Sequence, residues 1–343
     1  MARSVSMKDV AQLARVSVGT VSNVLNRPSR VSSATRQRVE DAIDKLGWVR
    51  NESARQLRAG RSDAVGMIVL DISNPFFADV IRGAEAFCHE QGYLVHIGNS
   101  DQVQDRQDDL LRHFEQHRVR GVLLAPISSD LGLCDQLKRR GIPVVLVDRT
   151  TSGGFCAVGV DDVEGGRLAV GHLLEQGHRR LAFVGGPGSL AQVRDRRLGG
   201  DLALARVADA AAMLVVSTPT LDVASGLAAA GEIAALPDGE RPTGVFACND
   251  LVAIGLLQGF VAAGLAIPGD VAIIGYDDID FAAASAVPLS SVRQPRFELG
   301  ATAARLLFDE IAAADEQAAH SHSMIRLAPE LVGRQSTAAG RAG

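Results

Sequence analysis

Several features that mark large classes of protein are missing from this sequence of 343 residues. It has no run of 18 or more apolar residues, so no transmembrane helix and no membrane partner are expected. The first residues, Met1 to Lys8, lack the apolar core of a secretory signal peptide. We therefore expect a protein that stays in the cytoplasm.

Cysteine is scarce, and its spacing argues against two kinds of cross-link. The four cysteines are widely separated and form no Cys-x-x-Cys pair: Cys88, Cys134, Cys156 and Cys248. This spacing argues against a zinc site and against a disulfide framework. We expect all four to be ordinary buried thiols.

The motifs of common enzymes are also missing. Residues 184–189, Val-Gly-Gly-Pro-Gly-Ser, lack the Gly-Lys-Ser/Thr ending of a phosphate loop, and we interpret them as a tight strand-to-helix loop. The acidic cluster Asp277-Asp278-Ile279-Asp280 has no His or Cys nearby in sequence, and His320 and His322 are predicted to be solvated loop residues rather than ligands. With no nucleophile elbow and no convincing triad, we expect no enzyme, no metal and no cofactor.

The overall charge of −5 hides an asymmetry along the chain. Residues 1–62 carry 12 Lys and Arg against 5 Asp and Glu, a net charge of +7. The remainder carries 23 against 35, a net charge of −12. A basic segment on an acidic body suits a polyanionic partner, which the acidic body would repel.

The first sixty residues predict short helices. Residues 7–14 place Val10, Leu13 and Ala14 on one face, and Ser17 is expected to cap a second helix that ends at Asn26-Arg27-Pro28-Ser29. A third helix is expected to start at Ser32 or Ser33 and to end at Gly47, followed by a polar linker.

Beyond residue 62, fully apolar strand-like runs alternate with helical patterns, which is typical of parallel sheets covered on both faces. Eight or more such runs exceed one doubly wound sheet of usual size, so two lobes are expected. The predicted fold is an N-terminal all-α helix-turn-helix domain (1–48), a hinge (49–62) and an α/β domain of two doubly wound parallel-sheet lobes (63–343). We assign 63–160 and 292–322 to the first lobe, and 161–291 and 323–343 to the second.

The strongest local signal lies in residues 7–26, where two short helices joined by a tight turn can place the second helix in a DNA major groove. Val18 and Gly19 would stand in its first turn and Asn23 one turn later, while short polar side chains would contact phosphates: Ser17, Thr20, Ser22 and Asn26. A small three-helix protein-interaction domain remains the alternative, although spacing and charge favour DNA.

This run resembles the helix-turn-helix of the lactose-repressor (LacI/GalR) family in Asp9-Val10-Ala11, Val16-Ser17, Thr20-Val21-Ser22 and Val24-Leu25-Asn26. The resemblance continues through Arg30-Val31-Ser32 to a stretch ending in Ala54-Arg55-Gln56-Leu57-Arg58. It implies that Ser32, Asn51 and Ala54 contact DNA and that Leu57, on a hinge helix, enters a minor-groove base step. Arg50-Asn51 departs from the family's usual Pro-Asn.

The body resembles the family's effector domain and the ribose-binding periplasmic proteins, so the expected pocket lies at the carboxyl ends of strands. By this resemblance we carry ligand contact to ten positions: Asn74, Phe76, Phe77, Asp148, Arg149, Arg196, Leu221, Asn249, Asp277 and Gln294. Leu221 is aliphatic where an aromatic wall is expected. Two rings beside a charge-balanced polar fringe favour a neutral sugar such as ribose or another aldose. Asp250 and Asp278 are interpreted as structural.

The leading hypothesis is therefore a transcription regulator, most simply a repressor, controlled allosterically by a small ligand. The resemblance implies a homodimer on pseudo-palindromic operator DNA. A solute-binding protein of a sugar transporter is the alternative, and the absence of a signal peptide together with the basic N-terminal segment argues against it. A nucleotide- or sugar-processing enzyme would need a motif that the sequence lacks.

Overall fold

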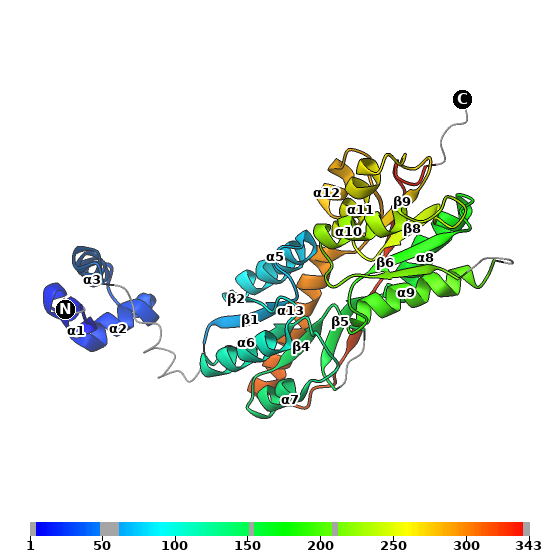
Figure 1. Cartoon of the computed structure of the whole chain (residues 1–343). Helices are drawn as coiled ribbons and strands as arrows, with labels where there is room; N and C mark the ends of the chain where they lie inside the picture. The colour runs from blue at the N-terminus through cyan, green and yellow to red at the C-terminus, as the bar shows by residue number, and fades with distance from the viewer. Residues whose placement is uncertain (1–4, 49–61, 151–153, 208–211, 339–343) are drawn as a thin grey trace. The chain divides into compact units, whose positions relative to one another are not determined.

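The computed structural model describes residues 5–48, 62–150, 154–207 and 212–338 (Figure 1). The chain divides into two compact units, residues 1–61 and 62–343. No described helix is long and apolar enough to span a lipid bilayer.

The first unit is a bundle of short helices: α1 (Met7–Ala14), α2 (Val18–Asn26), the 3-10 turn η1 (Pro28–Arg30) and α3 (Ser33–Leu46). Their ends follow local chemistry. The Ser17 side chain accepts a hydrogen bond from the Thr20 backbone N–H at 3.0 Å and so caps α2. Gly47, at φ 57°, ends α3 in the left-handed conformation that glycine adopts without strain.

The core of this unit is small and aliphatic, and these side chains are buried: Val10, Ala11, Ala14, Val21, Val24, Val39 and Ala42. Leu13, which the periodicity placed on the buried face, is instead 43% exposed. The reason is that Ala11 and Ala14 line the packed face of α1, which leaves Leu13 on its flank.

The second unit contains two six-stranded sheets. The first, in the order β11-β5-β4-β3-β1-β2, is parallel throughout and consists of Met324–Leu327, Cys156–Val160, Val144–Val147, Val122–Leu124, Ala64–Val69 and Leu94–Asn99. The second has the order β12-β10-β9-β8-β6-β7 and consists of Glu330–Val332, Ser290–Arg293, Ala272–Asp277, Gly244–Ala247, Leu181–Gly185 and Leu214–Ser217. Only the β10–β12 pairing in it is antiparallel.

Helices cover both faces of each sheet, as fully apolar strands require (Figure 1). The first sheet packs against α5 (Pro75–Glu90) and α13 (Arg296–Glu316) on one face and α6 (Gln104–Gln116) and α7 (Gly132–Arg139) on the other. The second packs against α8 (Asp162–Glu175) and α9 (Ala191–Leu204), and against α10 (Val223–Ala234) and α11 (Asp250–Ala262). The short α12 spans Asp280–Ala284.

Glycines set how closely the paired helices approach. A Cβ added at Gly199 of α9 would lie 1.9 Å from the Val163 carbonyl oxygen of α8, and one at Gly166 of α8 would lie 1.9 Å from the Arg196 carbonyl oxygen of α9. Only glycine fits at such a contact, so α8 and α9 meet backbone to backbone.

The chain passes between the two sheets three times. The first two crossings follow β5 and β10. The prediction placed the last change of lobe at residue 323, whereas β11 pairs with β5 in the first sheet and β12 with β10 in the second. The crossing therefore follows Leu327, because the apolar stretch Met324–Leu327 extends the first sheet instead of the second.

Candidate functional site

The first candidate surface is the exposed side of α2. Ser17, Val18, Gly19, Asn23 and Asn26 are exposed on it, while Thr20 and Ser22 are half-buried. The apolar Val18 side chain is 42% exposed although Val21 and Val24 of the same helix are buried. The first turn of α2 therefore presents an apolar side chain and a glycine on the surface.

The polar residues of α2 divide into two kinds. The Asn26 Nδ2 donates to the Ser22 carbonyl oxygen at 2.9 Å, and Ser17 caps the helix, so both side chains have partners within α2. No hydrogen bond of the Asn23 side chain is found among the residues that the structure describes. Ser32 is exposed and its hydroxyl donates to Thr35 Oγ1 at 3.0 Å.

The remaining predicted DNA contacts, Asn51, Ala54 and Leu57, lie outside the described residues.

The second candidate site is a cavity where the strands of both sheets end. Asp148 follows β4, Asn249 follows β8 and Asp277 is the last residue of β9. The cavity is lined by Leu70, Asp71, Asn74, Phe76, Phe77, Gln102, Asp148, Leu190, Gln192, Arg196, Leu221, Asn249 and Asp277. It thus occupies the edge at which doubly wound sheets bind ligands.

The apolar lining comes from both lobes but differs in kind. The first lobe supplies Phe76 and Phe77, both buried, whose rings meet edge to face with centroids 4.9 Å apart. The second lobe supplies the aliphatic Leu190 and Leu221. Among the described lining residues, aromatic rings are therefore confined to one lobe.

Arg196 is held by a buried network. Its Nε donates to Asp162 Oδ1 at 2.8 Å, and its Nη1 donates to the Cys248 carbonyl oxygen at 2.8 Å. Its guanidinium also stacks over the Tyr276 ring at 3.7 Å and lies 3.7 Å from Asp277 Oδ1. The Arg196 side chain is only 4% exposed, so its charge is largely committed to these partners.

Two of the three carboxylates that line the cavity, Asp148 and Asp277, are in unfavourable surroundings. Burial, followed by the charge of Asp162, raises the pKa of Asp148 to about 7. Burial also raises the pKa of Asp277 to about 6, against the attraction of Arg196. Both residues have positive φ, 57° for Asp148 and 101° for Asp277, which turns the backbone sharply where each strand ends.

One oxygen in the cavity lacks a partner. Asp148 Oδ1 is buried and has no hydrogen-bond partner within the described part of the chain. By contrast, Asp277 Oδ1 accepts a hydrogen bond from Gln294 Nε2 at 2.7 Å. Asp148 is thus the carboxylate that a ligand can satisfy.

The structure brings eight of the ten predicted effector residues to this cavity: Asn74, Phe76, Phe77, Asp148, Arg196, Leu221, Asn249 and Asp277. Arg149 and Gln294 do not line it. Gln294 stands behind Asp277 and orients it. Arg149 is half-buried, and burial, followed by the charge of Arg194, lowers its pKa.

Sequence reasoning missed some of the lining and one support. Gln102, Leu190 and Gln192 line the cavity, and Asp162 holds Arg196. Asp162 begins α8 directly after β5, so the rule that polar residues gather where strands end already pointed to it. Gln192 lies one turn before Arg196 on α9 and carried no comparable signal.

The interpretation of Asp250 and Asp278 as structural agrees with their contacts. The buried Asp250 accepts hydrogen bonds from Ser291 Oγ at 2.7 Å and from the Ile279 backbone N–H at 2.8 Å. Asp278 forms ion pairs with Arg293 at 2.8 Å and with Arg334 at 2.7 Å.

His320 and His322 lie outside any helix or strand, as the sequence suggested, but their side chains are less solvated than expected. Each side chain is only 24% exposed, and both pack against Glu310 and Cys156. No sequence pattern indicated this contact, because Cys156 lies more than 160 residues earlier in the chain.

Comparison with known proteins finds a matching family for each part of the chain that holds a candidate site. Residues 6–51 match the bacterial regulatory proteins of the lacI family, and residues 170–337 match a periplasmic binding protein-like domain. The chain is 33% identical to the HTH-type transcriptional repressor PurR of Photobacterium profundum, with 96% of this chain and 98% of that protein covered.

Solved structures agree with this match. The lac repressor dimer bound to operator and the anti-inducer ONPF is 25% identical, with 98% of this chain and 99% of that chain covered and a TM-score of 0.82. A LacI family regulator from Enterococcus faecium with bound ribose is 32% identical, with 80% and 98% covered and a TM-score of 0.70. The chain therefore belongs to the lacI family of bacterial regulatory proteins and is a DNA-binding transcription regulator controlled by a small ligand.

Proposed function

We propose that this regulator is a repressor that binds a pseudo-palindromic operator as a homodimer, and that a small neutral sugar, such as ribose or another aldose, sets its operator affinity. The observation that carries the proposal for the effector is the charge of the cavity. Asp148 and Asp277 line it, whereas Arg196, the cationic side chain among the described lining residues, is already bound by Asp162.

This arrangement disfavours an anionic ligand. A phosphate or carboxylate would lie in a cavity lined by three carboxylates, Asp71, Asp148 and Asp277, with no free guanidinium in the described lining to pair with it. Hydroxyl groups suit the same cavity, because they can donate to Asp148 Oδ1 and exchange hydrogen bonds with Asn74, Asn249 and Gln192. The Phe76 and Phe77 rings offer an apolar surface to the C–H face of a sugar ring.

A purine base is the second candidate, suggested by the similarity to repressors named PurR. A flat heterocycle gains most when it is stacked between two aromatic faces. Here the second lobe contributes the aliphatic Leu190 and Leu221, which supports a sugar over a base. The ribose-bound relative from Enterococcus faecium supports the same choice.

Isothermal titration of the purified protein with aldoses, sugar phosphates and purines tests this proposal. We expect saturable binding of one neutral aldose and, in Asp148→Asn, a loss of affinity of about 10- to 100-fold, the range for a hydrogen bond to a charged group. Asp201→Asn, which changes an exposed carboxylate on α9, is the control and should bind normally. Binding of purines or sugar phosphates alone would overturn the sugar proposal.

For operator reading, we propose that Val18 and Gly19 allow close approach to a base edge and that Asn23 contacts a base directly. The Asn23 side chain is exposed, and an amide can pair with adenine in the major groove. Asn23→Ala should change the preferred base at one position of each half-site, measured by binding to a randomised operator library. Equal weakening on all sequences would assign Asn23 to a phosphate instead.

Leu57, carried over by resemblance, is proposed as the apolar wedge that kinks the operator. Leu57→Ala should weaken specific binding strongly and leave nonspecific binding unchanged in an electrophoretic mobility assay. Unchanged operator affinity would remove this role.

A further inference from the structure

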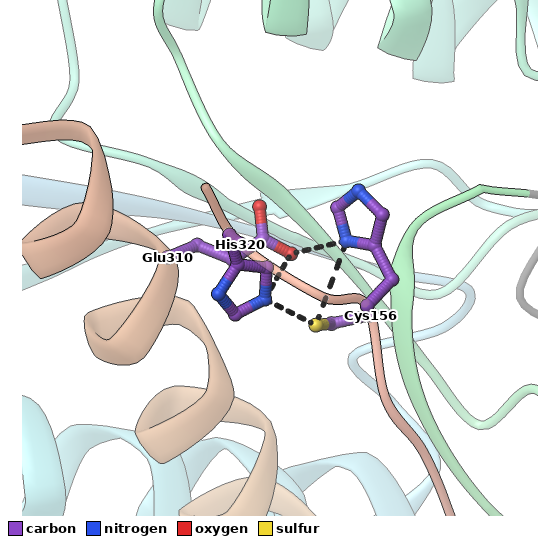
Figure 2. A group of neighbouring side chains, drawn as sticks. Cys156, Glu310 and His320 are labelled. Carbon is purple, nitrogen blue, oxygen red and sulfur yellow. Dashed lines mark hydrogen bonds and ion pairs between the residues drawn. The ribbon is translucent and has the colours of Figure 1, made fainter. Parts of the chain in front are cut away.

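Four side chains that can bind a metal converge at the edge of the first sheet opposite the effector cavity. Cys156 is the first residue of β5, Glu310 lies in the last turns of α13, and His320 and His322 lie in the segment between α13 and β11. Figure 2 shows Cys156, Glu310 and His320 directed toward one another. One donor atom from each of the four residues lies within 4.8 Å of the others.

Four of the six separations between donor atoms are close to those of a tetrahedral site. Cys156 Sγ lies 3.2 Å from His320 Nε2 and 3.7 Å from His322 Nδ1. Glu310 Oε1 lies 3.3 Å from His322 Nδ1 and 3.9 Å from His320 Nε2. Zinc bonds of about 2.0–2.3 Å place neighbouring tetrahedral ligands about 3.3–3.7 Å apart, so the donors stand close to the required spacing.

Glu310 supplies a second, independent observation. Its side chain is only 7% exposed, and its Oε1, which faces the cluster, has no hydrogen-bond partner among the described residues. A buried carboxylate oxygen that accepts no hydrogen bond is unfavourable, and a cation bound between it and the two imidazoles would stabilise it. The cluster itself offers only a thiol and two imidazoles.

We propose that Cys156, Glu310, His320 and His322 form a binding site for a divalent transition metal of the zinc class. The donor set of one sulfur, one oxygen and two nitrogens is typical of Zn²⁺. On binding, Cys156 releases its proton to solvent and coordinates as a thiolate. Together with the Glu310 carboxylate it balances the two charges of the ion, so the buried site becomes neutral.

Among the described residues, Lys138 is a positively charged neighbour of the cluster, and its ammonium group disfavours metal binding. Its Nζ lies 2.8 Å from His322 Nε2 and 2.9 Å from the Gly154 carbonyl oxygen. When His322 binds metal through Nδ1, its Nε2 carries the proton and meets the ammonium group donor to donor. The exposed Lys138 side chain therefore turns away on metal binding, and Lys138→Met should bind metal more tightly than the wild type.

The bound metal would fasten the segment after α13 to the start of β5. Because β1 and β5 are parallel members of one sheet, this is also the edge at which Ala64 begins β1, just after the linker residues. The cavity lined by Asp148 lies at the other edge. The metal site is therefore distinct from the effector cavity.

Titration of the metal-free, tag-free full chain with Co²⁺ tests the site, because tetrahedral cobalt–thiolate centres absorb strongly in the visible and near ultraviolet. We expect one equivalent of Co²⁺ to produce both a visible band and a thiolate charge-transfer band in the near ultraviolet. Added Zn²⁺ should displace the Co²⁺ and remove both bands. Cys156→Ala should abolish the thiolate charge-transfer band. His320→Ala, a change outside any helix or strand, should weaken binding by at least about tenfold.

A double variant, His113→Ala with His117→Ala, is the matched control. These residues form another histidine pair, on and just after α6, with ring centroids 4.1 Å apart, and could bind cobalt adventitiously. The double variant should leave both bands unchanged. The proposal is overturned if wild-type protein gives no charge-transfer band, if His320→Ala binds normally, or if the double variant abolishes the signal. Circular dichroism checks that each variant folds.

Discussion

Asp148 lies at a position where burial opposes its charge. Its pKa is raised from an ordinary value of 3.8 to about 7, so between these pH values the folded chain holds a proton that the unfolded chain has lost. The free energy of unfolding therefore falls as pH rises through this window and is flat beyond it. Asp277, whose pKa is raised to about 6, acts in the same direction.

Asp148→Asn should remove the contribution of Asp148. We expect the ligand-free variant to be more stable than the wild type at pH 8, by at most about 4 kcal/mol, and the gain to shrink toward pH 4. Asparagine tolerates the positive φ of this position. Urea unfolding at several pH values measures the effect.

The matched control for this experiment is Asp101→Asn, which makes the same change at an exposed residue that also has positive φ, 54°. It should alter stability little at any pH. A pH-independent gain in Asp148→Asn would contradict the proposed cause.

Arg196 and Arg197 are adjacent on α9, but their surroundings differ. Arg196→Ala leaves Asp162 buried without its partner and should lower the free energy of unfolding by about 3–5 kcal/mol. Arg197, 49% exposed and paired with Asp201 one turn away, should lose less than about 0.5 kcal/mol when changed to alanine. Denaturant unfolding of both variants checks this, and equal losses would show that the buried network is not what stabilises α9.

At single positions, the sequence predicted which residues lie at the pocket better than it predicted which other residues they contact. The family resemblance assigned Asp148, Asn249 and Asp277 to the pocket, and the rule for strand ends agreed, because an apolar run followed by a polar residue is visible in the sequence. The sequence did not predict that Arg149 lies outside the described lining of the cavity. Nor did it predict that Gln294 orients Asp277, since both outcomes depend on contacts between segments distant in sequence. The cluster around Glu310 was missed for the same reason.

At the level of elements, the close approach of α8 and α9 depends on glycine. Gly199→Ala places a methyl group against the Val163 carbonyl oxygen, so the helices must separate. We expect a loss of about 1–3 kcal/mol from overpacking and weaker effector binding, because Asp162 on α8 then moves away from Arg196 on α9. Thermal unfolding and effector titration measure the two effects.

Gly171, also in α8, provides the comparison. A Cβ there meets no atom within 4 Å, so Gly171→Ala should stabilise the chain by about 0.5–1 kcal/mol through helix propensity alone. If both variants behaved alike, helix propensity and not the helix contact would govern α8 and α9.

The ends of helices were predicted well where a capping residue determines them. Ser17 caps α2 and Gly47 ends α3, as their residue types indicated. The last strands were harder to assign. Met324–Leu327 is short and could have joined either sheet, and its pairing with β5 follows from the path of the chain after α13, which no local pattern encodes.

For the whole molecule, the charge distribution distinguishes the segment that binds DNA from the domain that binds the effector. The basic N-terminal segment attracts a polyanion such as DNA, and the net charge of −12 on residues 63–343 disfavours nonspecific DNA binding there. Because a small ligand controls this regulator, effector and operator bind at different sites and their affinities are linked.

This linkage makes a prediction that needs no knowledge of the direction of the switch. If the effector changes operator affinity by some factor, typically about 5- to 150-fold, operator DNA must change effector affinity by the same factor. Fluorescence anisotropy with labelled operator and calorimetric titration with the aldose, each with and without the other ligand at one salt concentration, measure both factors. Asp148→Asn should weaken effector binding yet leave operator affinity without effector unchanged. Unequal factors in the wild type would mean that another equilibrium, such as dimer dissociation, is coupled to one of the two binding steps.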